Sequence, residues 1–143
     1  MPSARHTIAV VDDDLIFTGM LRDFLEGEGY RMLAWPEAQG AQALLRSEQP
    51  DLLILDVRLE QPEAGRRILE LARQDADTAH IPIIVCSADS QFLRRNLTFL
   101  RLHATAVLEK PFDLDALQDA IEAAIGKARP RPHDGAADSN ASF

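Results

Sequence analysis

Three successive carboxylates, Asp12, Asp13 and Asp14, follow an apolar run in the segment "IAVVDDDL". Carboxylates this close repel each other by roughly 1 kcal/mol per pair in water, and by several-fold more in a less polarisable site. A divalent cation would offset that cost, and Mg²⁺ takes oxygen ligands while keeping several waters. Asp14 is expected to cap the following helix, which leaves Asp12 and Asp13 as candidate metal ligands.

Polar side chains also follow three later apolar runs. Asp56 comes after "LLIL", Ser87 after "IIVC" and Lys110 after "AVLE". In an open parallel sheet, ligands bind outside the carboxyl ends of the strands, where the strand order reverses. Each of these residue types takes part in phosphate or Mg²⁺ chemistry. Their convergence on strand ends therefore predicts one site for a phosphate group and Mg²⁺.

The elements that must position these side chains alternate along the chain. Short runs rich in Val and Ile are separated by stretches of helical period, a pattern typical of βαβ units and a parallel sheet. The expected strands are Ile8–Val11, Met32–Trp35, Leu52–Val57, Ile81–Ser87 and Ala106–Glu109. The expected helices are a first one closed by Gly27 and Gly29, then Pro36–Ser47, Gly65–Gln74, Ser90–Leu102 and a last one that is capped by Asp113 and ends before Gly126. This order predicts an α/β fold with five parallel strands and helices on both faces.

Composition limits the classes of function. The chain has 143 residues, 46% of them hydrophobic, which fits one domain; we place it at residues 6–126 and expect 127–143 to be disordered. A net charge of −8 argues against nucleic acid as the main partner. We find no signal peptide or membrane-spanning run, so a cytoplasmic location with no membrane contact is expected. The single cysteine, Cys86, is interpreted as a core residue.

Four of these segments together resemble the receiver domain of two-component response regulators. They are "VVDDD", "PDLLILD" ending in Asp56, "PIIVCSA" containing Ser87, and "VLEKPFDLDAL" containing Lys110. The resemblance covers roughly residues 6–126. It implies a flavodoxin-like, doubly wound sheet with strand order 2-1-3-4-5.

The resemblance also implies roles for individual residues. Asp56 would be the phosphoacceptor, and Mg²⁺ would be bound by Asp12, Asp13, Asp56 and the backbone carbonyl of Arg58. The phosphoryl donor would be a histidine kinase or a phosphotransfer protein. The chain would then act as a signalling switch whose only chemistry is its own phosphorylation and dephosphorylation.

Two further residues complete the implied site. Ser87 would be the switch hydroxyl that binds the phosphoryl group, and Lys110 the cation that pairs with it. The Lys110–Pro111 bond is expected to be cis, as is common in receivers, because X–Pro bonds make that conformation accessible. Phosphorylation would bias a surface that binds a downstream protein.

The chain departs from the family pattern in three places. The loop "VRLEQPEAG" sets Pro62 and Gly65 one or two residues late, which changes the expected rim of the site. Val107 stands where receivers usually carry a Tyr or Phe that turns inward with the switch hydroxyl. Arg58 and Asp89 occupy variable positions near the site, and we hypothesise that they pair across its mouth and restrict water access.

The expected fourth helix, "SQFLRRNLTFLRL", carries more apolar residues than one buried face needs. Phe92, Phe99 and Leu102 form a second face that could be deeply buried or could bind a partner. With Ser87 and Val107 they are our candidate output surface. A homodimer through the fourth helix, fifth strand and fifth helix is one form that this contact could take.

Two other classes of function use similar residues. A receiver-like scaffold that binds partners without phosphorylation is the main alternative, which Val107 makes conceivable. A Mg²⁺-dependent phosphohydrolase would need a second acidic residue two positions after Asp56, where Arg58 stands. No output domain is expected after residue 126, so a stand-alone switch is the favoured interpretation.

Overall fold

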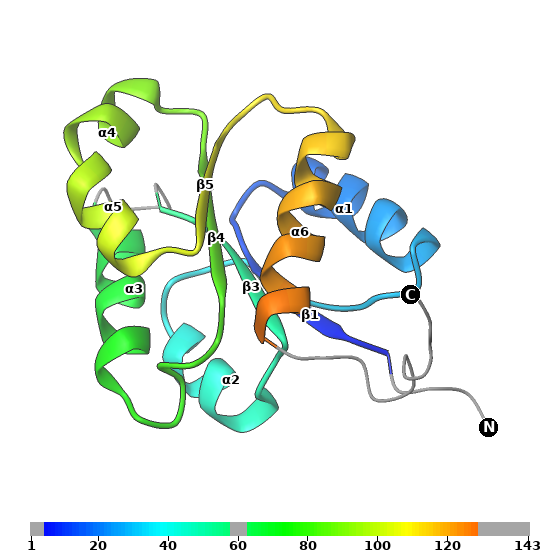
Figure 1. Cartoon of the computed structure of the whole chain (residues 1–143), viewed down its shortest axis with the longest axis horizontal. Helices are drawn as coiled ribbons and strands as arrows, with labels where there is room; N and C mark the ends of the chain where they lie inside the picture. Colours follow the sequence, from blue (N-terminus) through cyan, green and yellow to red (C-terminus); the bar gives the residue numbers. More distant parts are fainter. Residues whose placement is uncertain (1–4, 58–62, 129–143) are drawn as a thin grey trace.

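A five-stranded parallel sheet forms the centre of the molecule (Figure 1). The computed structural model describes residues 5–57 and 63–128. The strands are β1 (Thr7–Val11), β2 (Arg31–Trp35), β3 (Leu52–Asp56), β4 (Ile83–Ser87) and β5 (Ala106–Glu109). The helices are α1 (Leu15–Gly27), α2 (Ala41–Glu48), α3 (Ala64–Gln74), α4 (Ser90–Arg95), α5 (Leu97–His103) and α6 (Leu114–Ala128). The strand order β2-β1-β3-β4-β5 confirms the expected doubly wound, flavodoxin-like topology.

The two faces of the sheet pack into two separate cores because successive residues of a strand point to opposite sides. Ile8 and Val10 face α1 and α6, where Leu21 and Ile121 are buried. The alternate residues Ala9 and Val11 face the opposite core, which contains residues of α2, α3 and α5. Figure 1 shows α1 and α6 on one side of the sheet and the other four helices on the opposite side. Burial on both faces explains why β3 and β4 are continuously apolar until their last residue.

Helix α2 begins later than Pro36, where the sequence pattern placed its start. The indole N–H of Trp35 donates to the carbonyl oxygen of Gln39 at 2.8 Å. Gly40 then takes a left-handed backbone conformation with φ of 83°, which a glycine adopts without steric penalty. The chain therefore turns over residues 36–40 before the helix can start at Ala41.

The expected fourth helix is two helices, α4 and α5, separated at Asn96. The backbone of Asn96 leaves the helical conformation, with φ of −110° and ψ of 16°. Its side-chain amide and its backbone N–H both donate to the carbonyl oxygen of Phe92, at 2.9 and 3.1 Å. The last helix, in contrast, is longer than expected. It continues through Gly126 to Ala128, because Gly126 does not have a positive φ that would end it.

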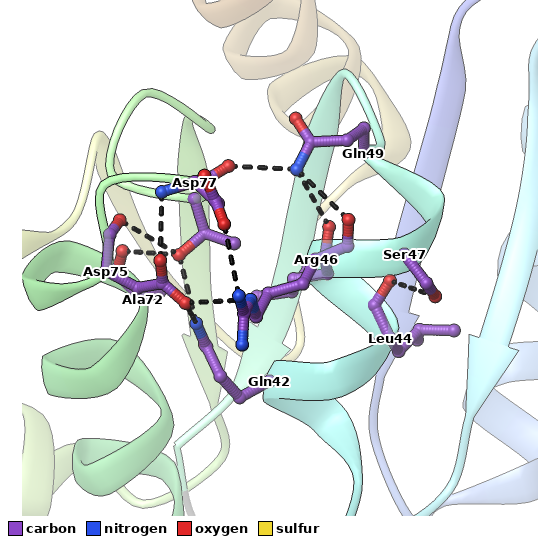
Figure 2. Close-up of polar contacts among 10 residues, drawn as sticks. Gln42, Leu44, Arg46, Ser47, Gln49, Ala72, Asp75 and Asp77 are labelled. Atoms are coloured by element: carbon purple, nitrogen blue, oxygen red, sulfur yellow. Dashed lines mark hydrogen bonds and ion pairs between the residues drawn. The ribbon is translucent and has the colours of Figure 1, made fainter.

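Polar contacts join α2 to the segment between α3 and β4 (Figure 2). The guanidinium of Arg46 lies 3.2 Å from carboxylate oxygens of both Asp75 and Asp77. The amide of Gln42 donates to Asp75 at 3.0 Å, and that of Gln49 donates to the carbonyl of Asp77 at 2.9 Å. The backbone N–H of Asp77 and the amide of Gln42 lower the pKa of Asp75. These contacts lie at the edge of the sheet where the strands begin.

Arg73, near the end of α3, connects two neighbouring segments. Its Nε donates to the carbonyl oxygen of His103, the last residue of α5, at 2.7 Å. Its terminal nitrogen donates to the carbonyls of Ala79 and Ile81 at 3.0 and 2.7 Å. Arg73 therefore fixes the end of α5 to the segment that leads into β4.

Gly65 provides the sharpest packing constraint on the fold. A Cβ atom at this position would overlap the backbone of Val57, the residue directly after Asp56. We expect Gly65→Ala to lower the free energy of unfolding by about 2 kcal/mol or more, since backbone cannot yield as a side chain can. The matched control is Gly19→Ala in α1, where a Cβ would meet nothing within 4 Å.

Urea unfolding followed by circular dichroism measures both variants. Gly19→Ala should be neutral or stabilising by up to about 1 kcal/mol, because it removes a glycine from a helix interior. Equal midpoints for Gly65→Ala and the wild type would contradict the close approach of α3 to Val57.

Candidate functional site

Side chains from four strand ends meet at the carboxyl edge of the sheet, where the order reverses between β1 and β3. Asp12 and Asp13 follow β1, and Asp56 ends β3. Each of these three carboxylates offers an oxygen, and the three oxygens lie within 4.8 Å of one another. Asp12 and Asp56 are only 1% and 7% exposed, whereas Asp13 is exposed. The structure thus brings together the carboxylates that the sequence pattern singled out.

Lys110 supplies the cation of this cluster. Its Nζ donates to Oδ2 of Asp12 at 2.8 Å and lies 3.6 Å from Oδ2 of Asp56. Burial by itself would lower the pKa of Lys110, but the hydrogen bond to Asp12 and the surrounding charges outweigh it and raise the pKa. The backbone N–H of Lys110 donates to the carbonyl of Ser87 at 2.8 Å, which fixes the end of β5 beside β4. The Lys110–Pro111 bond is cis, as expected.

Asp14 plays the capping part that the sequence indicated. Its side chain accepts hydrogen bonds from the backbone N–H groups of Ile16 and Phe17 at 3.1 and 3.0 Å. Its own N–H donates to Oδ1 of Asp12 at 2.9 Å. One oxygen of Asp12 is therefore held by the backbone and the other by Lys110. The turn between β1 and α1 thereby orients the buried carboxylate.

Ser87 is buried at the end of β4, and its hydroxyl oxygen accepts a hydrogen bond from the backbone N–H of Asp89 at 3.1 Å. The side chain of Asp89 accepts from the N–H of Phe92 at 2.9 Å and so caps α4. A chain of two hydrogen bonds therefore runs from the Ser87 hydroxyl to the first turn of α4. The neighbouring Cys86 is fully buried, and burial raises the pKa of its thiol, in keeping with a core residue.

The site opens to solvent through a cavity of about 320 Å³. Its lining residues are Asp13, Asp14, Asp56, Ser87, Ala88, Asp89 and Lys110. The three clustered carboxylates and the one ammonium carry a formal net charge of −2 when all are ionised. An all-oxygen donor set with this charge deficit fits a hard divalent cation such as Mg²⁺. The carbonyl of Arg58, expected as a further ligand, lies outside the described residues, as does any Arg58–Asp89 pair.

The candidate output residues lie in different environments. Phe92 is 8% exposed and packs in the core, so of the two interpretations left open for this face, deep burial applies to Phe92. Phe99 is half-buried, with the Arg66 guanidinium 4.3 Å above its ring. Leu102 is 76% exposed. Val107 is half-buried and lines a groove of about 500 Å³ between β5 and the α4–α5 segment.

Sequence reasoning missed the contact between Phe17 and Lys110. It placed Phe17 only on the apolar face of the first helix, but the structure sets Lys110 Nζ 3.9 Å from the centroid of the Phe17 ring. The signal that could have found it is position. Phe17 lies three residues after Asp14, within the first turn of a helix that begins at the site.

Comparison with known proteins agrees with this geometry. Residues 8–122 match the response regulator receiver domain family. The nitrogen assimilation regulatory protein NtrX of Azorhizobium caulinodans is 28% identical over 127 residues, which cover 88% of this chain and 27% of NtrX. The transcriptional regulatory protein ZraR of Salmonella typhimurium is 31% identical over 129 residues, 90% of this chain and 28% of ZraR. The chain thus spans about a quarter of the length of these regulators.

Solved structures give the same assignment. A response regulator from Chloroflexus aurantiacus is 27% identical with a TM-score of 0.77, covering 86% of this chain and 99% of that one. The receiver domain of the sensor histidine kinase PA1611 from Pseudomonas aeruginosa is 25% identical with the same TM-score and coverage. That structure has a magnesium ion coordinated in its active site cleft. The chain belongs to the family of response regulator receiver domains, which are switches in phosphorylation-based two-component signalling.

Proposed function

We propose that Asp56 accepts a phosphoryl group from a histidine kinase or phosphotransfer protein in a Mg²⁺-dependent reaction, and that this event switches a protein-binding surface. The observation that carries the proposal is the cluster of Asp12, Asp13 and Asp56, with their oxygens within 4.8 Å of one another and Lys110 beside them. A phosphorylation-independent scaffold would gain nothing from gathering these charges. The proposed metal ligands are the three carboxylates and the backbone carbonyl of Arg58.

The proposed transfer follows from the chemistry of the groups. An oxygen of Asp56 attacks the phosphorus of a phosphohistidine, the P–N bond breaks, and an acyl phosphate forms. The attacking carboxylate and the phosphoryl group are both anionic, so positive charge must be present as they approach. A bound Mg²⁺ would supply part of that charge. Lys110, 3.6 Å from Asp56, would supply the rest by moving its ammonium from Asp12 to a phosphoryl oxygen.

The wider biological setting belongs to the same proposal. We propose a cytoplasmic, stand-alone switch that acts through downstream proteins, with residues 6–126 as the receiver. The disordered tail expected from residue 127 is wrong at its start, because α6 continues to Ala128, and the rest of that tail lies outside the described residues. The polar-differentiation response regulator DivK of Brucella ovis, 24% identical, is matched over 98% of its own length and supports this architecture. Across the described residues, the structure contains no helix long and apolar enough to cross a membrane.

The first test is intact mass after incubation of the purified chain with Mg²⁺ and acetyl phosphate. We expect a gain of one phosphoryl group, because Asp56 is a nucleophile next to a metal site and a lysine. Asp56→Asn should abolish the gain, since an amide does not attack phosphorus, and removal of the metal with EDTA should do the same. A gain that persists in Asp56→Asn would contradict the assignment. Mg²⁺ binding with no gain from acetyl phosphate or any phosphohistidine donor would favour the scaffold alternative.

The phosphoryl donor should contact the exposed start of α1. Leu15 and Ile16 are 72% and 87% exposed and follow Asp14, which lines the mouth of the site. A protein that delivers a phosphohistidine to the buried Asp56 must cover this rim, and apolar side chains there would be buried in the complex.

Replacing both Leu15 and Ile16 with Ser should therefore slow transfer from a phosphorylated histidine phosphotransfer protein about tenfold, as expected for interface hot spots. Transfer from acetyl phosphate, which makes no such contact, should stay within about twofold of the wild-type rate. Leu102→Ser is the matched control, because Leu102 is 76% exposed but lies on α5. An equal loss with both donors would contradict a docking role.

The switched surface is proposed to lie along α4, α5 and β5 and to include Val107, Phe99 and Leu102. When Ser87 turns to bind the phosphoryl group, its hydroxyl can no longer accept from Asp89, whose side chain caps α4. This route does not need an aromatic side chain at position 107. The same surface is where we propose partner binding or homodimerisation.

Amide NMR spectra recorded before and after phosphorylation test this route. We expect the largest shifts at the start of α4, at Asp89, Phe92 and Leu93. In Ser87→Ala, phosphorylation should still occur, but these shifts should be largely lost because the hydrogen-bond chain no longer starts at the site. Unchanged shifts in Ser87→Ala would mean that the signal reaches α4 by another path.

A further inference from the structure

We propose that Phe17 is a positioning residue for Lys110 and that its ring face holds the ammonium at the phosphoacceptor through a cation–π contact. The inference rests on the proposed function, since it names a residue that prepares the same site. Lys110 Nζ lies 3.9 Å from the ring centroid of Phe17, within the range in which a ring face attracts a cation. The Lys110 side chain is 13% exposed, so water only weakly screens this contact.

The ring of Phe17 is fixed from two directions. Its backbone N–H is held by the side chain of Asp14 at 3.0 Å, so the same cap that starts α1 sets the position of this residue. On the other side, its ring lies edge-to-face with the ring of Phe112, with centroids 6.0 Å apart and planes at 88°. Phe112 follows Lys110 by two residues, across the cis Lys110–Pro111 bond. The segment that carries the lysine therefore also contacts the ring.

The ring face gives the Lys110 ammonium a contact that it can keep when it changes its carboxylate partner. The ammonium is hydrogen-bonded to Asp12 at 2.8 Å and is farther from Asp56, at 3.6 Å. To pair with a phosphoryl group on Asp56, it must give up its hydrogen bond to Asp12. The attraction of a cation to a ring face is less directional than a hydrogen bond, so it persists while Nζ exchanges one oxygen for another. The flexible lysine stem then stays in the site during the exchange.

The composition of the chain makes this contact easy to observe. Only two of its fifteen basic residues are lysines, Lys110 and Lys127. Selective ¹³C labelling of lysine therefore gives one side-chain signal set from the site and one internal reference. Protons above a ring face shift upfield, so the ε-methylene of Lys110 should resonate upfield of that of Lys127.

Four forms of the full chain test the proposal: wild type, Phe17→Leu, Phe17→Tyr and Phe24→Leu. Phe24 is the matched control, because it is a half-buried phenyl ring on the same helix that packs against the same core as Phe17. The upfield shift of Lys110 should be lost in Phe17→Leu and kept in the other three. At saturating Mg²⁺, the rate of phosphorylation by acetyl phosphate should fall about three- to tenfold in Phe17→Leu and stay within about twofold in Phe17→Tyr and Phe24→Leu.

The outcomes separate this inference from the proposed function. If the wild type takes up no phosphoryl group from any donor, the proposed function fails and this inference with it. If the wild type is phosphorylated but Phe17→Leu reacts at the same rate, or Phe24→Leu is slowed equally, only the positioning role of Phe17 is overturned. Amide spectra check that each variant is folded. Should Phe17→Leu not fold, Phe17→Met, which keeps similar volume without a ring, takes its place.

Discussion

Electrostatic balance at the carboxyl edge of the sheet is the constraint on which the rest of the structure depends. Asp12 and Asp56 are buried close together, an arrangement that would be strongly unfavourable without compensation. Lys110 provides part of it from 98 residues away in the sequence, by reaching back from the end of β5 to the end of β1. The end of β5 therefore places one ammonium next to the two buried carboxylates.

The compensation is incomplete, which suits a site proposed to bind Mg²⁺ and accept a phosphoryl group. Three carboxylates surround one ammonium, so the site keeps an excess of negative charge that attracts a further cation. Two uncharged groups hold Asp12 and Lys110 in place when no metal ion is bound. The backbone N–H of Asp14 holds one oxygen of Asp12, and the Phe17 ring lies against the ammonium. Neither changes the net charge, so neither reduces the attraction for a metal ion.

The sequence predicted the order and type of nearly all elements, because alternating apolar runs and helical stretches report directly on burial. It failed where a local contact between a side chain and the backbone decides an element boundary. The Trp35 indole bonded to Gln39 delays α2. The expected fourth helix divides at Asn96, whose side-chain amide shares the Phe92 carbonyl with its own backbone N–H. Contacts of this kind depend on rotamers, and hydrophobic periodicity carries no information about them.

The same distinction applies to the site. Strand ends converge by topology, so Asp12, Asp56, Ser87 and Lys110 could be identified as neighbours before any coordinates. The sequence could not predict which carboxylate oxygen Lys110 binds, because Asp12 and Asp56 are both within its reach. The sequence could not decide whether Phe92 is buried, for a related reason. A face is defined only within a continuous helix, and the division at Asn96 removes the register that would have related Phe92 to the residues after it.

The hydrogen bonds of Arg73 restrain one end of the α4–α5 segment more than the other. The guanidinium of Arg73 binds the last carbonyl of α5 and two carbonyls of the segment that leads into β4. The end of α5 is therefore fixed in place. The opposite end begins at Asp89, beside the proposed phosphoacceptor site, and the two helices are separated at Asn96. The start of α4 is linked to Ser87 by hydrogen bonds, whereas the end of α5 is bound through Arg73. The displacement of these helices on phosphorylation should therefore be greatest in α4 and decrease along α5. A partner protein that responds to this displacement would bind closer to α4 than to α5.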